Sequence, residues 1–195
     1  MANNFAAVAA LLSMKLGSIS DSEAKRTLDE AVEQVKVMAR VHRRLRAREN
    51  EVSFYSAAFI RELCDDLEEM THGRPIVIEC DADSSPLCME QAVLLGLIVN
   101  ELVTNAIKHA FPDGRPGRIR VRLEVGHAQL GLSVDDDSIG LAPYVRSSNM
   151  GQGQELVRGL THELEGDLEI ESTTSGSSFR LTFPCASAGT ASEAC

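Results

Sequence analysis

The sequence predicts an α+β protein in which a helical hairpin, residues 1–50, precedes a sandwich of helices and strands, residues 51–184. Three observations lead to this fold class. Apolar residues recur at helical spacing through the first 48 residues, with a break at residues 17–21. After Val52 the composition shifts, and segments that alternate apolar and polar residues, as half-buried strands do, appear between helical ones. Asn100–Ala110 separates its polar and apolar residues onto two sides of one helix.

The hairpin is predicted from two apolar stripes. The first helix carries its stripe at Phe5, Val8, Ala9, Leu12 and Leu16, and the second at Leu28, Val32, Val35, Met38, Val41, His42 and Leu45. Asp21 and Ser22 are candidate N-caps for the second helix. Because one hairpin cannot bury both stripes, we expect a homodimer through residues 1–48 that forms a four-helix bundle.

The sandwich is predicted from a series of shorter elements. The first are a helix from Phe54 to Leu67, a strand Ile76–Cys80, and a long helix that starts at Ser85-Pro86 and ends before Phe111. A hairpin of Ile119–Val125 with Leu130–Val134 follows. The last are a helix of about Gly153–Glu165 ended by Gly166, and strands around Leu168–Ile170 and Phe179–Phe183. The arginines between Ile119 and Val125 are expected to form a solvated sheet face. Residues 185–195 are small and polar, which predicts a disordered tail.

Charge and composition exclude several classes of function. A formal net charge of −10 argues against general affinity for nucleic acid or an anionic membrane. The longest apolar runs, Phe5–Met14 and Val93–Val99, are shorter than the ~18–20 residues of a membrane span, so we expect no membrane contact by this chain. The five cysteines contain no Cys-x-x-Cys pair, so neither a zinc site nor a disulfide framework is indicated, and a cytoplasmic location fits best.

The polar face of Asn100–Ala110 carries the first candidate site. Glu101 and Asn105 are four residues apart and therefore lie one above the other, with Lys108 and His109 on the next turn. The amide oxygen of Asn105 suits Mg²⁺, and Glu101 can orient or deprotonate a nucleophile. Lys108, and less favourably His109, can contact phosphate. A half-exposed helix with a solvated polar face is the alternative.

Two further motifs follow in order. Asp135–Leu141 places carboxylates at the end of a predicted strand, where one of them can accept a hydrogen bond from an exocyclic amine. Gly151–Gln154 places two glycines just before a helix, where backbone N–H groups can approach a phosphate. Each motif alone is common on protein surfaces, but the three in this order indicate a nucleotide site.

These motifs resemble those of the sensor histidine kinases, whose ATP domains are Bergerat-type (GHKL) ATPases. Asn100–Ala106 resembles the N box, Asp136–Leu141 the first glycine box and Gly151–Gly153 the second. Asn3-Asn4 resembles the end of the acceptor motif His-Arg-x-x-Asn-Asn. The resemblance implies a dimeric helical hairpin followed by a Bergerat-type α/β sandwich. It also implies that Asn105 binds Mg²⁺, Glu101 acts as general base, Asp136 reads adenine, and Gly140, Gly151 and Gly153 shape the pocket for ATP.

The function implied by this resemblance is that of an ATP-dependent protein histidine kinase. Such a kinase transfers the γ-phosphoryl group to a histidine, from which it passes to an aspartate in the receiver domain of a response regulator. One alternative is a catalytically inactive dimeric adaptor that binds a response regulator or a kinase. Another Bergerat-type ATPase, such as a chaperone or a serine kinase, fits less well because a helical hairpin precedes the ATP domain. Nucleotide binding distinguishes the kinase from the adaptor.

Three features depart from the family pattern. Ser138 replaces the first glycine of its box, so a backbone position that can require a positive φ carries a side chain. Gln152 and Gln154 stand where the family has apolar residues. The acceptor histidine would lie four residues before Asn3, so we expect this chain to lack it, and we expect His42 to belong to the helix core rather than to replace it.

Overall fold

The computed structural model describes residues 8, 11–14, 21, 24–25, 28, 31–32, 34–36, 38–39, 55–71, 73–138 and 152–185. The chain divides into two compact units, Met1–Val52 and Ser53–Cys195. The predicted tail from residue 186 onward lies outside the described residues, as do Asn3, Asn4 and His42.

The described residues of the first unit are helical except for Asp21, which caps the second helix. The Asp21 carboxylate accepts a hydrogen bond of 2.9 Å from the Ala24 N–H, and its carbonyl accepts one of 3.0 Å from the Lys25 N–H. This confirms one of the two predicted N-caps. Val32 and Ala39 of the second helix are buried.

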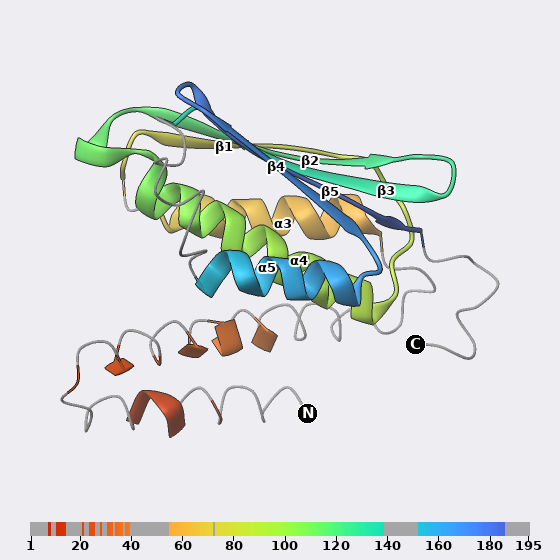
Figure 1. The fold of residues 1–195 in the computed structure, drawn as a ribbon, viewed down its shortest axis with the longest axis horizontal. Coiled ribbons are helices and arrows are strands. Elements are labelled where there is room, and N and C mark those ends of the chain that lie inside the picture. The colour runs from red at the N-terminus through yellow and green to blue at the C-terminus, as the bar shows by residue number, and fades with distance from the viewer. Residues whose placement is uncertain are drawn as a thin grey trace. The chain divides into compact units, whose positions relative to one another are not determined.

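The second unit is built on one five-stranded sheet (Figure 1). Its strands are β1 (Ile76–Ala82), β2 (Gly117–Val125), β3 (Gln129–Asp136), β4 (Asp167–Thr173) and β5 (Gly176–Pro184). Their order across the sheet is β1-β2-β3-β5-β4, with β1 parallel to β2 and every other pair antiparallel. The predicted hairpin of β2 and β3 is confirmed, the two predicted last strands pair as β4 and β5, and β1 and β4 form the edges.

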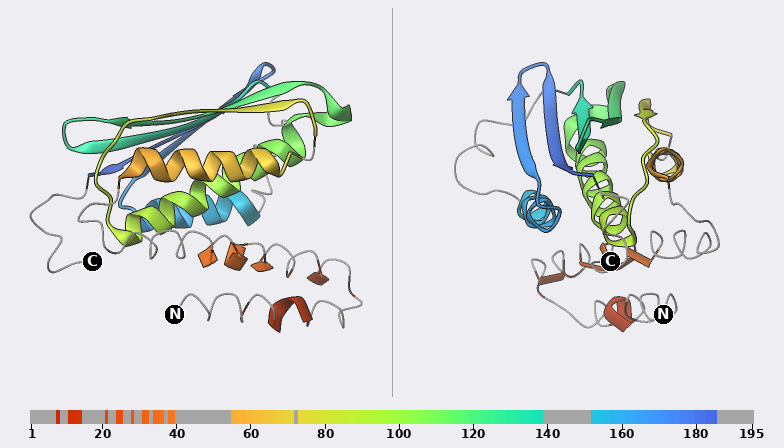
Figure 2. Two further views of the ribbon diagram at one scale, coloured as in Figure 1. Left: turned by 180° about the vertical axis from the view of Figure 1, so that it is seen from behind. Right: turned by 90° about the vertical axis from the view of Figure 1, so that its right-hand side faces the viewer.

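Three helices, α3 (Ser56–Glu69), α4 (Met89–Asn105) and α5 (Gln152–Glu163), cover one face of this sheet (Figure 2). α4 lies between the other two, while α3 packs on β1 and α5 on β4. The arrangement is a two-layer α/β sandwich, as predicted. Helix and strand side chains meet between the layers because the inward residues of each strand are apolar, as Val121, Leu132 and Leu181 illustrate.

α4 is the central helix of the core. Its buried residues occur on every side, since the sheet, α3 and α5 surround it: Ala92, Leu95, Gly96, Leu97, Ile98, Val99, Leu102 and Val103. With the segment that follows, it forms a continuous helix of 22 residues, Met89–Ala110, that is long and apolar enough to span a membrane, and 56% of its apolar window is buried inside the protein. The sequence predicted one long helix that ends before Phe111, and this end is confirmed.

The predicted start of the long helix at Ser85-Pro86 is wrong. α4 begins at Met89, and the Cys88 sulfur accepts a hydrogen bond of 3.5 Å from the Gln91 N–H as its N-cap. Ser85 is held outside the helix because its backbone pairs with Ser56, whose N–H donates to the Ser85 carbonyl and whose hydroxyl accepts from the Ser85 N–H. A tertiary contact with the start of α3 therefore overrides the local helix signal.

The end of α5 also differs from the prediction. The left-handed residue after the helix is Glu165, with φ of 53°, rather than Gly166. Gly166 is required for a different reason, since a Cβ there would lie 2.7 Å from the carbonyl oxygen of Thr182 on β5. The glycine allows β4 to start close against its neighbour.

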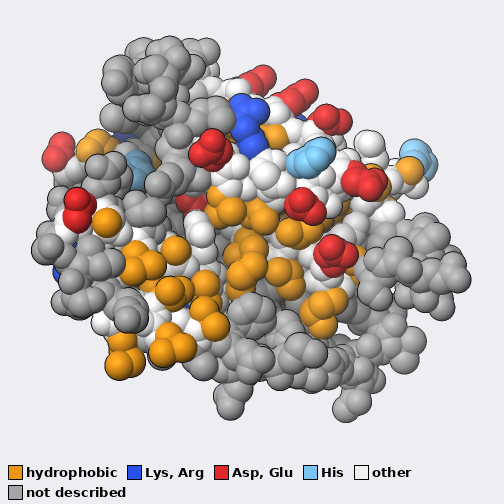
Figure 3. All heavy atoms as spheres, turned by 60° about the horizontal axis from the view of Figure 1, so that its bottom comes forward, with side chains coloured by type: hydrophobic (Ala, Val, Ile, Leu, Met, Phe, Trp, Pro, Cys, Tyr) orange, Lys and Arg blue, Asp and Glu red, His pale blue; other side chains and the backbone are white. Residues whose placement is uncertain are grey.

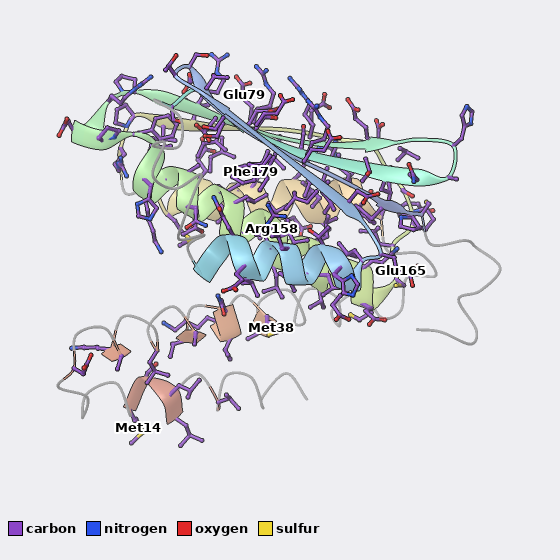
Figure 4. All side chains as sticks on the ribbon, in the orientation of Figure 1. Met14, Met38, Glu79, Arg158, Glu165 and Phe179 are labelled. Atoms are coloured by element: carbon purple, nitrogen blue, oxygen red, sulfur yellow. The ribbon has the colours of Figure 1, made fainter. Side chains whose placement is uncertain are left out.

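The outer face of the sheet is polar, as expected. Glu79 lies on that face and Phe179 on the face toward the helices (Figure 4). Arg118 and Arg120 each form an ion pair of 3.0 Å with Glu79. On the molecular face seen in Figure 3, acidic side chains are more prominent than basic ones, in keeping with the net charge of −10.

Candidate functional site

Glu101 and Asn105 form a hydrogen-bonded pair on the last turns of α4. The Asn105 Nδ2 donates to Glu101 Oε1 at 3.0 Å, and both residues are half-buried. An ionised carboxylate can only accept hydrogen bonds, so the NH₂ group of the Asn105 amide faces Glu101 and the amide oxygen is turned away from it. The pair therefore presents an amide oxygen and a second carboxylate oxygen, which are both ligands of the kind that Mg²⁺ prefers.

The first turn of α5 lies directly against this pair. A Cβ on Gly153 would collide with Glu101 Oε1 and would lie 2.8 Å from Asn105 Nδ2, so a side chain fits here only if its neighbours move. Two motifs that are about fifty residues apart in the sequence therefore meet in space. The glycine pattern predicted a role for Gly153 in approaching phosphate, and the structure adds that its missing side chain allows α5 to approach Glu101 and Asn105.

The helix changes its geometry immediately after Asn105. Ala106–Ala110 is a π-helix, so Lys108 and His109 do not continue the regular spacing from which their position was predicted. Both side chains are exposed. They lie one turn beyond Asn105 at the open end of the helix, where a flexible cation can reach a ligand.

Arg74 holds this irregular segment in place. Its guanidinium donates to the carbonyl of Ile107 and, at 2.5 Å, to that of Phe111. A helix end leaves carbonyl groups without backbone partners, and a cation there also complements the negative end of the helix dipole. No sequence signal pointed to Arg74, which precedes Ile107 by 33 residues in a loop without a motif.

Asp136 ends β3, where the strand leaves the sheet. Its Oδ1 accepts a hydrogen bond of 3.1 Å from the Ser138 N–H, which orients the carboxylate. Neighbouring Asp137 is an anchor, because its Oδ1 accepts from the Arg118 N–H at 2.7 Å and its carbonyl accepts from Arg115 at 2.9 Å. These bonds fix the backbone on which Asp136 stands.

Ser138 does not strain this loop. Among the described residues, Asp113 and Glu165 are the non-glycine residues with positive φ, so the concern raised by the missing glycine is not borne out. Ser138 is 3% exposed and closes a tight turn with Asp136. The serine is accommodated because its backbone stays in a region open to any residue.

Two other neighbours of the candidate residues were not predicted. Thr104 directly precedes Asn105 on the polar face of α4. Its buried hydroxyl has no hydrogen-bond partner within the described part of the chain. Ser177 stands opposite Asp136 in the β3–β5 pairing and is 5% exposed. Thr104 could have been included from its place on the polar helix face, whereas nothing in the sequence links Ser177 to Asp136.

The structure brings Glu101, Asn105 and Gly153 together, while Asp136 shares no hydrogen bond with any of the three in the described residues. Gly140 and Gly151 lie outside those residues. The candidate site therefore extends along α4, the start of α5 and the end of β3.

Two family profiles match successive parts of the chain. The family profile described as "Histidine kinase-, DNA gyrase B-, and HSP90-like ATPase" matches residues 90–187, and the one described as "Histidine kinase" matches residues 1–71. The sensor histidine kinase PdtaS of Mycobacterium tuberculosis is 32% identical over 169 residues, which are 85% of this chain and 34% of that protein. Blue-light-activated histidine kinase 2 of Erythrobacter litoralis is 28% identical over 129 residues, 65% of this chain and 37% of that protein.

A solved structure shows the same fold. The histidine kinase domain from the Erythrobacter litoralis EL346 blue-light activated histidine kinase gives a TM-score of 0.70 at 23% identity, covering 92% of this chain and 83% of that one. The chain spans about a third of the length of the curated relatives above. Since one profile covers half of the chain and the other covers the hairpin before it, the chain belongs to the histidine kinases with an ATPase domain of the histidine kinase, DNA gyrase B and HSP90 type.

Proposed function

We propose that this chain is the core of a two-component sensor histidine kinase, which binds Mg-ATP in the sandwich and transfers the γ-phosphoryl group to a histidine. The observation that carries this proposal is the approach of Gly153 to Glu101 and Asn105. It supports one site built from the N box and the second glycine box, as the family membership leads us to expect.

The donor set suits the cation and the phosphates. Asn105 would hold Mg²⁺ through the amide oxygen that its bond to Glu101 leaves outward. The N-terminus of α5, kept free of a side chain at Gly153, would offer backbone N–H groups to phosphate oxygens, and Lys108 and His109 would approach them from the π-helix. When bound, Mg²⁺ neutralises charge on the phosphates, which is the main requirement of phosphoryl transfer.

Asp136 would bind the adenine. Its Oδ1 accepts from Ser138, and Oδ2 has no hydrogen-bond partner in the described residues, so one carboxylate oxygen remains for the exocyclic amine of adenine. Gly140 and Gly151 would complete the pocket by the family pattern.

Glu101 would orient the accepting histidine and take up its proton. A carboxylate can accept the N–H of an imidazole and so direct the opposite ring nitrogen at the phosphoryl group. From the histidine, the group would pass to an aspartate of a response regulator. Positioning of these groups and neutralisation of charge would together supply most of the acceleration.

A homodimer through residues 1–48 completes the proposal. Val8, Leu11 and Met14 recur at helical spacing on the first helix and are 44%, 63% and 78% exposed. An apolar stripe left this open favours a second copy of the hairpin as its cover. The dimerisation hairpin would be residues 1–50 and the ATP domain residues 51–184.

The proposal is tested by Gly153→Ala, with Gly159→Ala as the matched control in the same helix. The new methyl group at residue 153 would displace the end of the flexible Glu101 side chain and break its bond to Asn105. We expect Mg-ATP affinity to fall roughly tenfold, the effect of losing about one charged hydrogen bond, with little change in stability. A methyl group on Gly159 would meet no atom within 4 Å, so that substitution should leave affinity unchanged.

Isothermal titration calorimetry with Mg-ATP distinguishes the outcomes. Equal affinity in both variants and the parent would contradict a site at Glu101, Asn105 and Gly153. Absence of binding to the parent chain would favour the non-catalytic adaptor instead.

A further inference from the structure

Cys64 and Cys80 lie at a contact between α3 and the edge strand β1. Two hydrogen bonds align the two elements: Ser56 Oγ donates to the Asp83 carbonyl at 2.8 Å, and Arg61 Nη2 donates to the Ala82 carbonyl at 3.3 Å. Later residues of α3 therefore lie beside earlier residues of β1, so the two elements run antiparallel. One turn further along α3, the side chain of Cys64 faces that of Cys80 on β1, and an interaction between the two thiols shifts the pKa of both. The pairing therefore follows from the register of helix and strand.

The side-chain directions agree with this contact. Cys64 is 3% exposed and belongs to the packed face of α3 with Ile60 and Leu67. On β1, Ile76 and Ile78 are buried, so by alternation Cys80 also faces the helices. Cys80 is nevertheless half-buried, because β1 is an edge strand and only β2 covers its side. Cys80 is thus the more exposed of the two residues.

We propose that Cys64 and Cys80 are a redox-active pair that hydroperoxides convert into a disulfide between α3 and β1. This inference is independent of nucleotide binding. Cysteines in a reducing compartment remain thiols unless they are arranged for transient oxidation, and two thiols that face each other across one packed contact have such an arrangement.

The environment divides the roles between the two sulfurs. The interaction with the Cys64 thiol, together with the charge of Arg61, lowers the pKa of Cys80 against the opposing effect of burial. The same interaction and its own burial raise the pKa of Cys64. Cys80 is therefore the thiolate that reacts first, and Cys64 is the resolving thiol.

The chemistry balances with one hydroperoxide. The Cys80 thiolate attacks a peroxide oxygen, the O–O bond breaks, and an alcohol or water leaves with a proton, which makes Cys80 a sulfenic acid. The Cys64 sulfur then attacks the Cys80 sulfur, the S–O bond breaks, and water leaves with the Cys64 proton. Two thiols are oxidised to one disulfide, and the peroxide is reduced.

The ring closed by this bond contains the loop that carries Arg74. Arg74 binds the carbonyls of Ile107 and Phe111, so the disulfide would constrain the chain that fixes the end of the Asn105 helix. A ring of this size restricts the unfolded chain, which predicts a rise in melting temperature of roughly 5–10 °C on oxidation.

The test treats the reduced full chain with hydrogen peroxide, blocks the remaining thiols with iodoacetamide, and maps peptides by mass spectrometry. We expect a peptide in which Cys64 and Cys80 of the same chain are cross-linked. The mass of the single chain should be lower than that of the reduced chain by two hydrogens, and dithiothreitol should reverse the change. Cys88 and Cys185 are the internal controls and should remain alkylated. In Cys64→Ser, dimedone should trap a sulfenic acid at Cys80, whereas Cys88→Ser should form the disulfide as the parent does.

Several results would overturn the proposal. These are the recovery of both cysteines as alkylated peptides after peroxide treatment, a disulfide between any other pair, and irreversible oxidation of Cys80 while Cys64 remains a thiol. A melting temperature that rises equally in Cys64→Ser and the parent would also contradict it, because that variant cannot close the ring.

Discussion

At the scale of single residues, the sequence predicted one contact of the candidate site, between Glu101 and Asn105, but not the contact of both with Gly153. The spacing of four on a helix predicts that Asn105 lies beside Glu101, and their hydrogen bond of 3.0 Å confirms it. The residue that faces them could not be predicted, because contact between α4 and α5 depends on tertiary packing. The sequence pattern presents Gly153 as a flexible residue near phosphate, while in the structure its small size permits the contact.

Asp136→Asn tests the proposed adenine contact. The substitution preserves shape and the acceptor oxygen near Ser138, but it replaces the second carboxylate oxygen with an amide donor. We expect ATP affinity to fall by about 1–3 kcal/mol, the range for a hydrogen bond to a charged group. Calorimetric titration measures the change. Asp137→Asn would not serve as a control, since Asp137 anchors Arg118; the exposed Glu124→Gln on β2 should bind ATP as the parent does.

At the scale of elements, the strands were easier to predict than the helix ends. Alternation in Ile119–Val125 and Leu130–Val134 matches β2 and β3 because one sheet face is buried. The start of α4 at Met89 could not be predicted, since Ser85 pairs with Ser56 across the fold. The π-helix after Asn105 was also unpredictable, because its carbonyls are held by Arg74 from another loop.

Arg74→Ala tests the role of that loop. The substitution removes the hydrogen-bond donors of the Ile107 and Phe111 carbonyls. Because Phe111 is buried, water cannot replace the lost donor there. We expect the free energy of unfolding to fall by about 2 kcal/mol in urea denaturation. Arg180→Ala, at an exposed position of β5, should change it by less than about 0.5 kcal/mol. Equal losses in the two variants would mean that Arg74 contributes only as a surface residue.

At the scale of the whole molecule, composition and motif order predicted the family and the sandwich, and the two profile matches agree with them. The contact of α3 with the edge strand β1, which brings Cys64 to Cys80, left no trace in the sequence because the residues are separated by a helix end and a loop. Sequence periodicity assigns a residue to a face but not to a partner across the core.

The dimer is the prediction that belongs to this scale. Size-exclusion chromatography with light scattering should give twice the chain mass for residues 1–195, since the exposed stripe of Val8, Leu11 and Met14 needs a cover. Deletion of residues 1–48 should give a monomer that retains its nucleotide affinity, because the candidate site lies within the second compact unit. A monomeric full chain would contradict the bundle, and a dimeric deletion would assign the interface to the sandwich.

The claim that the Asn105 helix and the start of α5 build a Mg-ATP site is tested most directly by calorimetric titration of the unaltered chain with ATP, with and without Mg²⁺. We predict one ATP bound per chain in the presence of Mg²⁺, and weaker binding without it, because the outward amide oxygen of Asn105 would then have no cation to bind. Asn105→Ala should reduce this difference. Binding that does not depend on Mg²⁺ or Asn105, or no binding at millimolar ATP, would contradict the account.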